Sequence, residues 1–285
     1  RDNCFTQCNG GNTMTHLNYK NIKGRSKETG ATLIVVLIIL LIVISVGVLA
    51  IRVAIVSLKV ATNSQVGQLN FQSSDTPLEL IVQMNPTTLT NITNVIGAAL
   101  KAHESNPGAE YNFCYKPTST SVSFAQTRGA SLLRAGSANN AVVEDGGVAG
   151  FCDLTSDYGS NRQAVVTQVA VNIPTDAMAD IPGSNLPRDI NLSEGTQLPK
   201  SMLSTQRIRV ITTAFLPAYA SNSLETLQSD CLSTSSAKIS DNFDSALTDK
   251  QTLADCLANH NVPFSTQVQE FNYTNKLTEI TAPGS

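Results

Sequence analysis

The stretch that decides the fold is ATLIVVLIILLIVISVGVLAI, from Ala31 to Ile51, and it contains no charged residue. As an α-helix it is about 30 Å long, which matches the hydrocarbon core of a bilayer. Polar atoms are nearly absent from it, which is unusual for the core helix of a soluble protein. The stretch therefore predicts a membrane-spanning helix near the N-terminus, with most of the chain on one side of the membrane.

Charged residues on either side of this stretch predict its orientation. Four basic residues precede it closely, offset by Glu28 alone, whereas Arg52 and Lys59 are the first basic residues after it. The positive-inside bias therefore places the N-terminus in the cytoplasm and the C-terminal bulk outside, although Arg52 acts in the opposite sense. The four preceding basic residues are Lys20, Lys23, Arg25 and Lys27.

The composition of the outer part predicts one polar domain. From Val53 onward the chain has 13 Lys and Arg against 20 Asp and Glu, and it has no Trp. An acidic domain argues against nucleic acid as the main partner, because phosphate binding needs a basic surface. About 230 residues are enough to bury one core of ordinary size.

Four cysteines lie in the expected outer domain: Cys114, Cys152, Cys231 and Cys256. An even number in an oxidising compartment predicts disulfides, and four cysteines allow three pairings. We favour Cys114–Cys152 and Cys231–Cys256, because each closes a local loop that is worth about 3–4 kcal/mol in the chain-entropy model. A metal site is disfavoured, since no two of them form a CxxC pair and no His lies at ligand spacing.

Three kinds of anchor fit the first 51 residues. A cleaved secretory signal has a candidate site at Val48–Ala50, but the apolar run is longer than such signals have. An uncleaved signal anchor is the second kind. The third is a type IV pilin leader, a short basic leader ending in Gly directly before the apolar helix, as at Gly30. We expect translation to start at Met14, with residues 1–13 upstream of it; a cytoplasmic tail is the alternative.

The residues around the leader carry a resemblance to a known family. The stretch KETGATLIVVLIILLIVISVGVLAIRVAIVSLKVATNSQVGQLNFQSSDTPL, from Lys27 to Leu78, resembles the N-terminal region of PilX-type minor pilins of type IV pili. The segment Cys231–Phe271 is similar to the same family. The resemblance implies that prepilin peptidase cuts between Gly30 and Ala31. It also implies that Ala31 becomes an N-methylated terminus and that the apolar helix is retained for filament assembly.

Two departures from the usual pilin pattern concern the assembly helix, whose candidate residues are Thr32, Leu33, Val35 and Arg52. Most pilins begin the mature chain with Phe, where this chain has Ala31. Most also carry Glu at the fifth mature position, which meets the terminal ammonium of a neighbour; here that position is Val35. The same departure marks the tip subunit of secretion pseudopili, so it implies a tip or initiating position.

The expected fold class is α+β and pilin-like. A long N-terminal transmembrane helix precedes a periplasmic domain with an antiparallel sheet, short helices and disulfide-closed loops. The expected divisions are a leader over 1–30, a transmembrane helix over 31–51, its periplasmic extension over 52–84 and a globular domain over 85–285. Pro77 is expected to end or kink the first helix.

Periodicity and turn residues predict the remaining elements. A second helix is expected from Pro86 to about Glu104, and short helices at Leu224–Cys231 and Thr248–Leu257. Loops are expected at Gly129–Asn140 and Asp180–Lys200. The expected strands are Tyr111–Tyr115, Val122–Ala125, Gln163–Ile173, Gln206–Phe215 and Phe264–Tyr273.

No motif for catalysis is present, and we expect neither an enzyme nor a cofactor. His260 is expected at the surface near a helix end. The acidic residues Asp241, Asp244, Asp249 and Asp255 lack calcium-loop spacing, which favours a solvated loop.

The predicted function is that of a non-enzymatic minor pilin that primes pilus assembly at or near the tip. It would sit in the bacterial inner membrane, with a periplasmic domain, and then in the pilus at the cell surface. Its partners would be other minor pilins, the major pilin and prepilin peptidase, with a tip adhesin as a further candidate. The alternatives are a minor pseudopilin of a type II secretion system and a signal-anchored periplasmic binding or enzymatic domain.

Overall fold

The computed structural model describes residues 30–117, 124–136, 139–159, 163–176, 201–244 and 246–278. The expected leader before Gly30 and the expected loop Asp180–Lys200 lie outside them. The chain divides into two units, Arg1–Leu58 and Lys59–Ser285.

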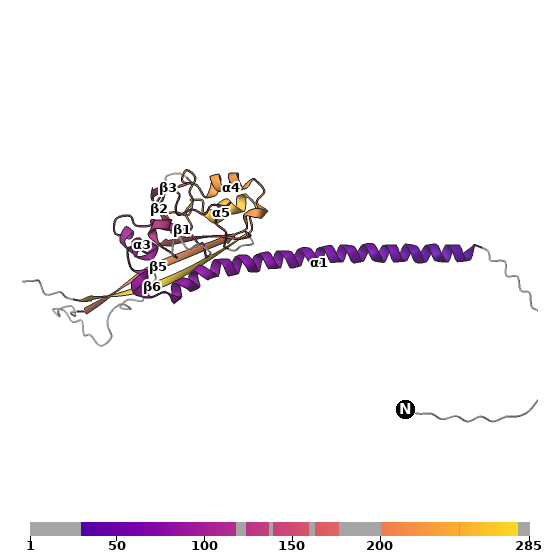
Figure 1. Cartoon of the computed structure of the whole chain (residues 1–285), viewed down its shortest axis with the longest axis horizontal. Coiled ribbons are helices and arrows are strands. Elements are labelled where there is room, and N and C mark those ends of the chain that lie inside the picture. Colours follow the sequence, from indigo (N-terminus) through magenta and orange to yellow (C-terminus); the bar gives the residue numbers. More distant parts are fainter. Residues whose placement is uncertain are drawn as a thin grey trace, which may run out of the picture. The chain divides into compact units, whose positions relative to one another are not determined.

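The first helix, α1, spans Ala31–Gln83 (Figure 1). Within the described residues, it is the helix that is long and apolar enough to cross a membrane. Its last turns belong to the second unit, where Leu78 and Ile81 are buried against the sheet.

Pro77 does not end α1, which continues to Gln83. Proline has no N–H and therefore leaves the carbonyl of Ser73, four residues earlier, without its helical donor. The hydroxyl of Thr167 donates to that carbonyl at 3.4 Å, and the hydroxyl of Thr212 donates to the neighbouring carbonyl of Ser74 at 2.6 Å. The sheet thus supplies a donor to the carbonyl that the proline leaves free, and a further one to its neighbour.

The expected single helix from Pro86 to Glu104 is wrong, because two helices occupy it, α2 (Pro86–Leu89) and α3 (Val95–His103). Two asparagines interrupt it. Asn91 accepts from the backbone N–H of Thr93, and Asn94 caps α3 by accepting from the N–H of Ile96, each at 3.0 Å. Asn side chains compete in this way with helical backbone bonds, which favours turns and caps.

The strands form one antiparallel sheet of six strands in the order β3-β2-β1-β4-β5-β6. The segment between β5 and β6 carries α4 (Leu224–Cys231) and α5 (Leu253–Asn259). The strands are β1 (Glu110–Cys114), β2 (Ala130–Ala135), β3 (Ala141–Asp145), β4 (Val166–Asn172), β5 (Ser201–Phe215) and β6 (Phe264–Thr278).

The sequence prediction of the sheet is right for β1, β4, β5 and β6 and wrong for its other edge. The expected loop Gly129–Asn140 contains β2, and β3 follows directly. Ala130 to Leu133 are all buried, so β2 lacks the alternation by which a half-exposed strand is recognised. The expected strand Val122–Ala125 is not formed at Phe124 and Ala125, which lie in a turn, and residues 122–123 are outside the described part.

The expected helix Thr248–Leu257 starts later, at Leu253. Thr252 and Asp255 form a capping box in which each side chain accepts from the other's backbone N–H. Such a box satisfies two N–H groups that have no helical acceptor and so defines the first turn. The expected helix Leu224–Cys231 matches α4.

Each face of the sheet has its own hydrophobic core. The last turns of α1 and helix α3 pack on one face, against residues such as Phe113 and Val169. The segment from β5 to β6, with α4 and α5, packs on the other face, against Phe215 and Leu133 (Figure 1). The expected α+β, pilin-like fold with an antiparallel sheet, short helices and disulfide-closed loops is confirmed.

Candidate functional site: the apolar helix and the disulfide-closed subdomain

The first 21 residues of α1 form an exposed apolar cylinder. The side chains from Leu33 to Ile51 are about half exposed or more, and the best window of the helix has a mean hydropathy of 3.5. The hydroxyl of Ser45 is satisfied within the helix, where it donates to the carbonyl of Leu41 at 2.7 Å. Beyond its first turn, such a surface suits lipid or other apolar helices, because the backbone hydrogen bonds are made within the helix.

The beginning of this cylinder holds the residues that the resemblance singled out. The carbonyl of Gly30 accepts from the N–H of Ile34 at 3.3 Å, so Gly30 stands directly before the first turn. A Cβ added at Gly30 would meet no atom within 4 Å, and its packing therefore does not require glycine. The first turn contains no acidic residue, and Val35 is 54% exposed on the cylinder.

Two disulfides close loops in the second unit. Cys114 at the end of β1 is joined to Cys152, and Cys231 at the end of α4 is joined to Cys256 in α5. These are the pairs that loop length favours. Three of these cysteines, Cys152, Cys231 and Cys256, are at most 4% exposed and belong to one core.

The disulfide-closed subdomain, residues 216–263, is fixed to the sheet by a shared glutamine. Gln228 on α4 donates through Nε2 to the carbonyl of Cys152 at 2.9 Å, and its Oε1 accepts from the N–H of Leu154 at 2.9 Å. The Gln228 amide thus links α4, which ends at the Cys231–Cys256 disulfide, to the backbone beside the Cys114–Cys152 disulfide. The two bridges and the glutamine hold the subdomain on the same face of the sheet.

A row of polar side chains crosses four strands beneath this subdomain. Glu110, Asn172, Arg209 and Glu270 are direct neighbours on β1, β4, β5 and β6. The first three are at most 7% exposed, and Glu270 at the sheet edge is 37% exposed. Opposed side chains on neighbouring strands interact most strongly, so this row is a continuous polar ladder.

Asp241 of the subdomain contacts two members of the ladder. It accepts from the side-chain amide of Asn172 at 3.2 Å and forms an ion pair with Arg209 at 3.4 Å. The Arg209 guanidinium also donates to both oxygens of Asp176 at 3.0 Å and to Glu270 at 2.7 Å. The expectation of a solvated acidic loop is therefore wrong for Asp241, whose side chain is 5% exposed and is paired with Arg209.

Glu110 at the other end of the ladder holds the subdomain by its backbone. Its two carboxyl oxygens accept from the N–H of Ser240 at 3.0 and 3.1 Å. Burial, and next the negative charge of Asp241, raise the pKa of Glu110 to about 8. The group is therefore largely protonated at neutral pH. Hydrogen bonds from Ser240 and from the side chain of Asn112, on the same face of β1, oppose this rise only in part.

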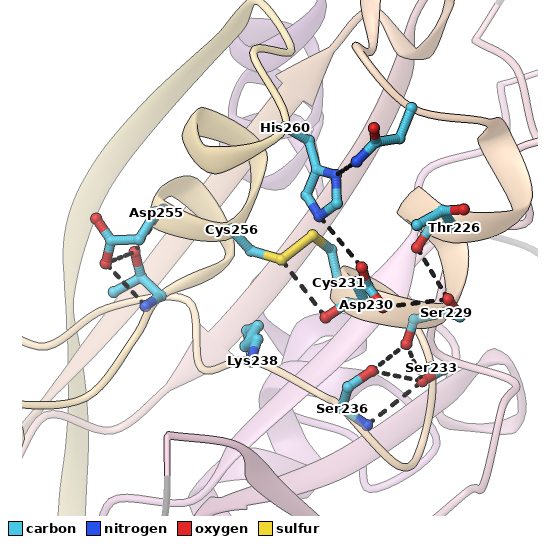
Figure 2. Close-up of a disulfide and its surroundings, with 12 residues drawn as sticks. Thr226, Ser229, Asp230, Cys231, Ser233, Ser236, Lys238, Asp255, Cys256 and His260 are labelled. Atoms are coloured by element: carbon cyan, nitrogen blue, oxygen red, sulfur yellow. Dashed lines mark hydrogen bonds and ion pairs between the residues drawn. A yellow bond between two sulfur atoms is a disulfide. The ribbon is translucent and has the colours of Figure 1, made fainter.

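His260 lies near the end of α5, as expected, but it is not a surface residue. Its side chain is 11% exposed and lies beside the Cys231–Cys256 disulfide (Figure 2). Nε2 is 3.5 Å from Asp230, and Nδ1 is 3.2 Å from the amide nitrogen of Asn222. The expectation that no His lies at ligand spacing is wrong, since His260 follows Cys256 by one helical turn.

The polar ladder was not found from the sequence, although one signal was present. Arg209 stands between Ile208 and Val210 in a predicted strand, and that alternation is typical of an arginine facing solvent. The burial comes from Ser240 and Asp241, which lie about thirty residues further along the chain. Nothing in the local pattern of β5 indicates that cover.

Comparison with known proteins identifies the region around the apolar helix. Residues 29–79 match the family model described as PilX N-terminal. The match covers the start of α1, its apolar cylinder and its passage onto the sheet. No curated protein and no solved structure matches the chain significantly.

Proposed function

We propose, from the match of residues 29–79 to the PilX N-terminal family model, that the chain is a minor pilin of a type IV pilus that initiates pilus assembly and occupies the tip. Val35 is the observation that carries the proposal. It stands where most pilins have the carboxylate that meets the terminal ammonium of the adjoining subunit.

Cleavage after Gly30 would give Ala31 a free ammonium at the start of an apolar helix. The first acidic residue after Ala31 is Asp75, which is far too distant along α1 to neutralise it. An unpaired charge at such depth costs at least about 2–3 kcal/mol. The ammonium therefore needs a carboxylate from another subunit, whereas Val35 offers none in return. A subunit that has the ammonium but lacks the carboxylate can pair with a neighbour on one side only. It therefore fits the end of a filament better than the interior of the shaft.

The processing step that creates this ammonium is supported by Gly30 itself. No neighbouring atom requires a glycine there, and its φ is not in the left-handed region. The fold therefore does not explain why residue 30 is glycine, whereas recognition by prepilin peptidase would explain it. The peptidase acts on the cytoplasmic side, which agrees with the basic residues before the helix and with a periplasmic second unit.

The apolar cylinder supports the proposed partners. Its side chains are exposed in the single chain and free of charge, so they suit lateral contact with the helices of other minor pilins and the major pilin. The chain would wait in the inner membrane and pass into the filament base when assembly starts. A tip adhesin is a further candidate partner for the disulfide-closed subdomain.

The Val35→Glu variant tests this function. With a carboxylate at the fifth mature position, the subunit would be able to accept a neighbour's ammonium and enter the shaft. We expect antibody label to move from pilus ends to positions along the shaft, or the number of pili to fall with their length unchanged. Val35→Leu is the matched control and should behave as the wild type.

Two results would contradict the proposal. Label distributed evenly along wild-type pili would make the chain an ordinary shaft subunit. A wild-type distribution of label and pilus number in the Val35→Glu strain would show that the missing carboxylate does not determine position.

A further inference from the structure

The Cys231–Cys256 disulfide has a third candidate metal ligand beside it. The two Sγ atoms and a ring nitrogen of His260 all lie within 4.8 Å of one another. Among the described residues, this is the group of three or more His, Cys, Asp or Glu side chains that could hold a metal ion. Figure 2 shows the imidazole of His260 directed at the bridge from the end of α5.

The distances fit one tetrahedral ion after small side-chain rotations. Zinc binds thiolate sulfur at about 2.3 Å and imidazole nitrogen at about 2.0–2.1 Å, so the ligand atoms of one site lie about 3.3–3.8 Å apart. The Cα atoms of Cys231 and Cys256 are 5.8 Å apart, and both residues are held by helices. Their backbone therefore keeps the two sulfurs near each other when the S–S bond is absent.

We propose that the reduced form of this chain binds one Zn²⁺ through Cys231, Cys256 and His260, with a water molecule as the fourth ligand. Asp230 precedes Cys231 on α4, and one of its oxygens lies 3.5 Å from Nε2 of His260. Binding exchanges two thiol protons for the metal ion and transfers no electrons. Zinc and the disulfide are therefore alternative closures of the same loop.

The surroundings of the imidazole agree with this role. Metal-bound histidines are generally oriented by a hydrogen bond from the nitrogen that does not touch the metal. Here the amide group of Asn222 lies 3.2 Å from Nδ1. Turned by 180°, that amide presents its oxygen to an Nδ1–H, which leaves Nε2 unprotonated toward the sulfurs and Asp230.

The burial of the two cysteines favours slow exchange of a bound ion with the solvent. Cys231 is 1% and Cys256 is 4% exposed, whereas the side chain of Asp230 is 51% exposed. The exposed carboxylate gives the ion a route inward, and the apolar core behind the sulfurs excludes competing water. The zinc form would keep the subdomain closed on a newly exported chain until an oxidant forms the bridge.

Cobalt(II) is a suitable probe, because its absorption distinguishes tetrahedral thiolate coordination from octahedral water. The full chain would be used in detergent, with Cys4 and Cys8 replaced by serine, under a phosphine reductant. We expect one Co²⁺ per chain with tetrahedral bands that Zn²⁺ abolishes. The oxidised protein should show none.

Two variants separate this site from general thiol binding. The Cys231→Ser/Cys256→Ser chain keeps the Cys114 and Cys152 thiols, which belong to no candidate metal group among the described residues, and should give no tetrahedral bands. His260→Ala keeps both thiols and should lose the spectrum at stoichiometric metal.

Three results would overturn the proposal. These are a reduced, folded chain without tetrahedral bands, an unchanged spectrum in His260→Ala, or equal binding by the chain that keeps only Cys114 and Cys152. If the metal-free reduced chain unfolds by circular dichroism, Zn²⁺ should restore the folded spectrum, since metal binding and folding are then coupled. Failure to restore it would contradict the proposal equally.

Discussion

At the residue scale, Glu110 shows how a single buried carboxyl can hold two parts of the chain together. It lies on β1, accepts from the backbone of Ser240 in the subdomain, and is neutral at pH 7 because its pKa is raised to about 8. A buried acid that stays protonated needs no opposite charge. Arg209 therefore forms its ion pairs with Asp241, Asp176 and Glu270 instead.

The raised pKa of Glu110 predicts how stability depends on pH. Because the folded state binds this proton more tightly than the unfolded state, the contribution is complete below pH 4.5 and is lost as the pH rises toward about 8. The loss should be on the order of a few kcal/mol. Glu110→Gln keeps an acceptor for Ser240 and supplies a donor, so it should remove this slope.

Urea unfolding of the full chain in detergent between pH 5 and pH 8.5 measures the effect. Glu270→Gln, at the partly exposed end of the ladder, is the matched control and should keep the wild-type slope. A Glu110→Gln protein whose stability still falls over this range like the wild type would show that another group is responsible.

Arg209 gives a second prediction at this scale. Replacing it with alanine leaves the buried carboxylate of Asp241 without its cation, and breaking a buried pair in this way costs about 3–5 kcal/mol. Arg207→Ala, which removes a side chain 14% exposed, should cost less. Equal losses in the free energy of unfolding for the two variants would contradict the role given to the ladder.

At the scale of elements, the disulfides determine whether the subdomain stays in place. Removing Cys231–Cys256 by double serine substitution should cost about 3–4 kcal/mol, since the bridge closes a loop with a sequence separation of 25. Loss of Cys114–Cys152, with a separation of 38, should cost about as much. The losses should appear as lower denaturation midpoints and lower levels in the membrane.

Proteolysis distinguishes the two bridges further. Without Cys231–Cys256, cleavage should concentrate between α4 and α5, while the sheet fragment survives. Uniform digestion, or a midpoint equal to that of the wild type under non-reducing conditions, would contradict a bridge that closes this subdomain.

The elements also show what sequence reasoning could reach. β4 and β5 carry long β-branched runs, and Ser223 caps the start of α4 by accepting from the N–H of Thr226, so their signals are local. β2 and β3 carry short signals, and their existence depends on pairing with β1. The break between α2 and α3 depends on two asparagines in a pattern whose apolar spacing continues.

For the site, the cysteine pairs followed from loop length, whereas the polar ladder and the position of His260 did not. These groups come together only when the segment from β5 to β6 folds back over the sheet. The polar ladder is therefore a property of the tertiary structure, whereas the four-residue spacing of Cys256 and His260 is present in the sequence.

At the scale of the whole molecule, the chain combines a helix whose first 21 residues carry no charge with a domain that contains two disulfides. The apolar cylinder is long and apolar enough to cross a membrane, and the domain is a separately folded unit. This division agrees with an N-terminal region of the PilX type.

The proposed processing at Gly30 would link the two parts to one function. Gly30→Leu should leave an uncut precursor and reduce surface pili, because the peptidase would no longer accept the residue before the cut. Folding should be unaffected, since a side chain at this position meets no atom within 4 Å. Gly47→Ala, also without a close neighbour, is the control and should be processed normally.

The most direct measurement is the N-terminal residue of the protein purified from membranes and pili, determined by sequencing or intact mass. The account predicts a chain that begins at Ala31 and carries an N-methyl group. A protein that retains Gly30 and the residues before it, or that begins at Ile51, would contradict it.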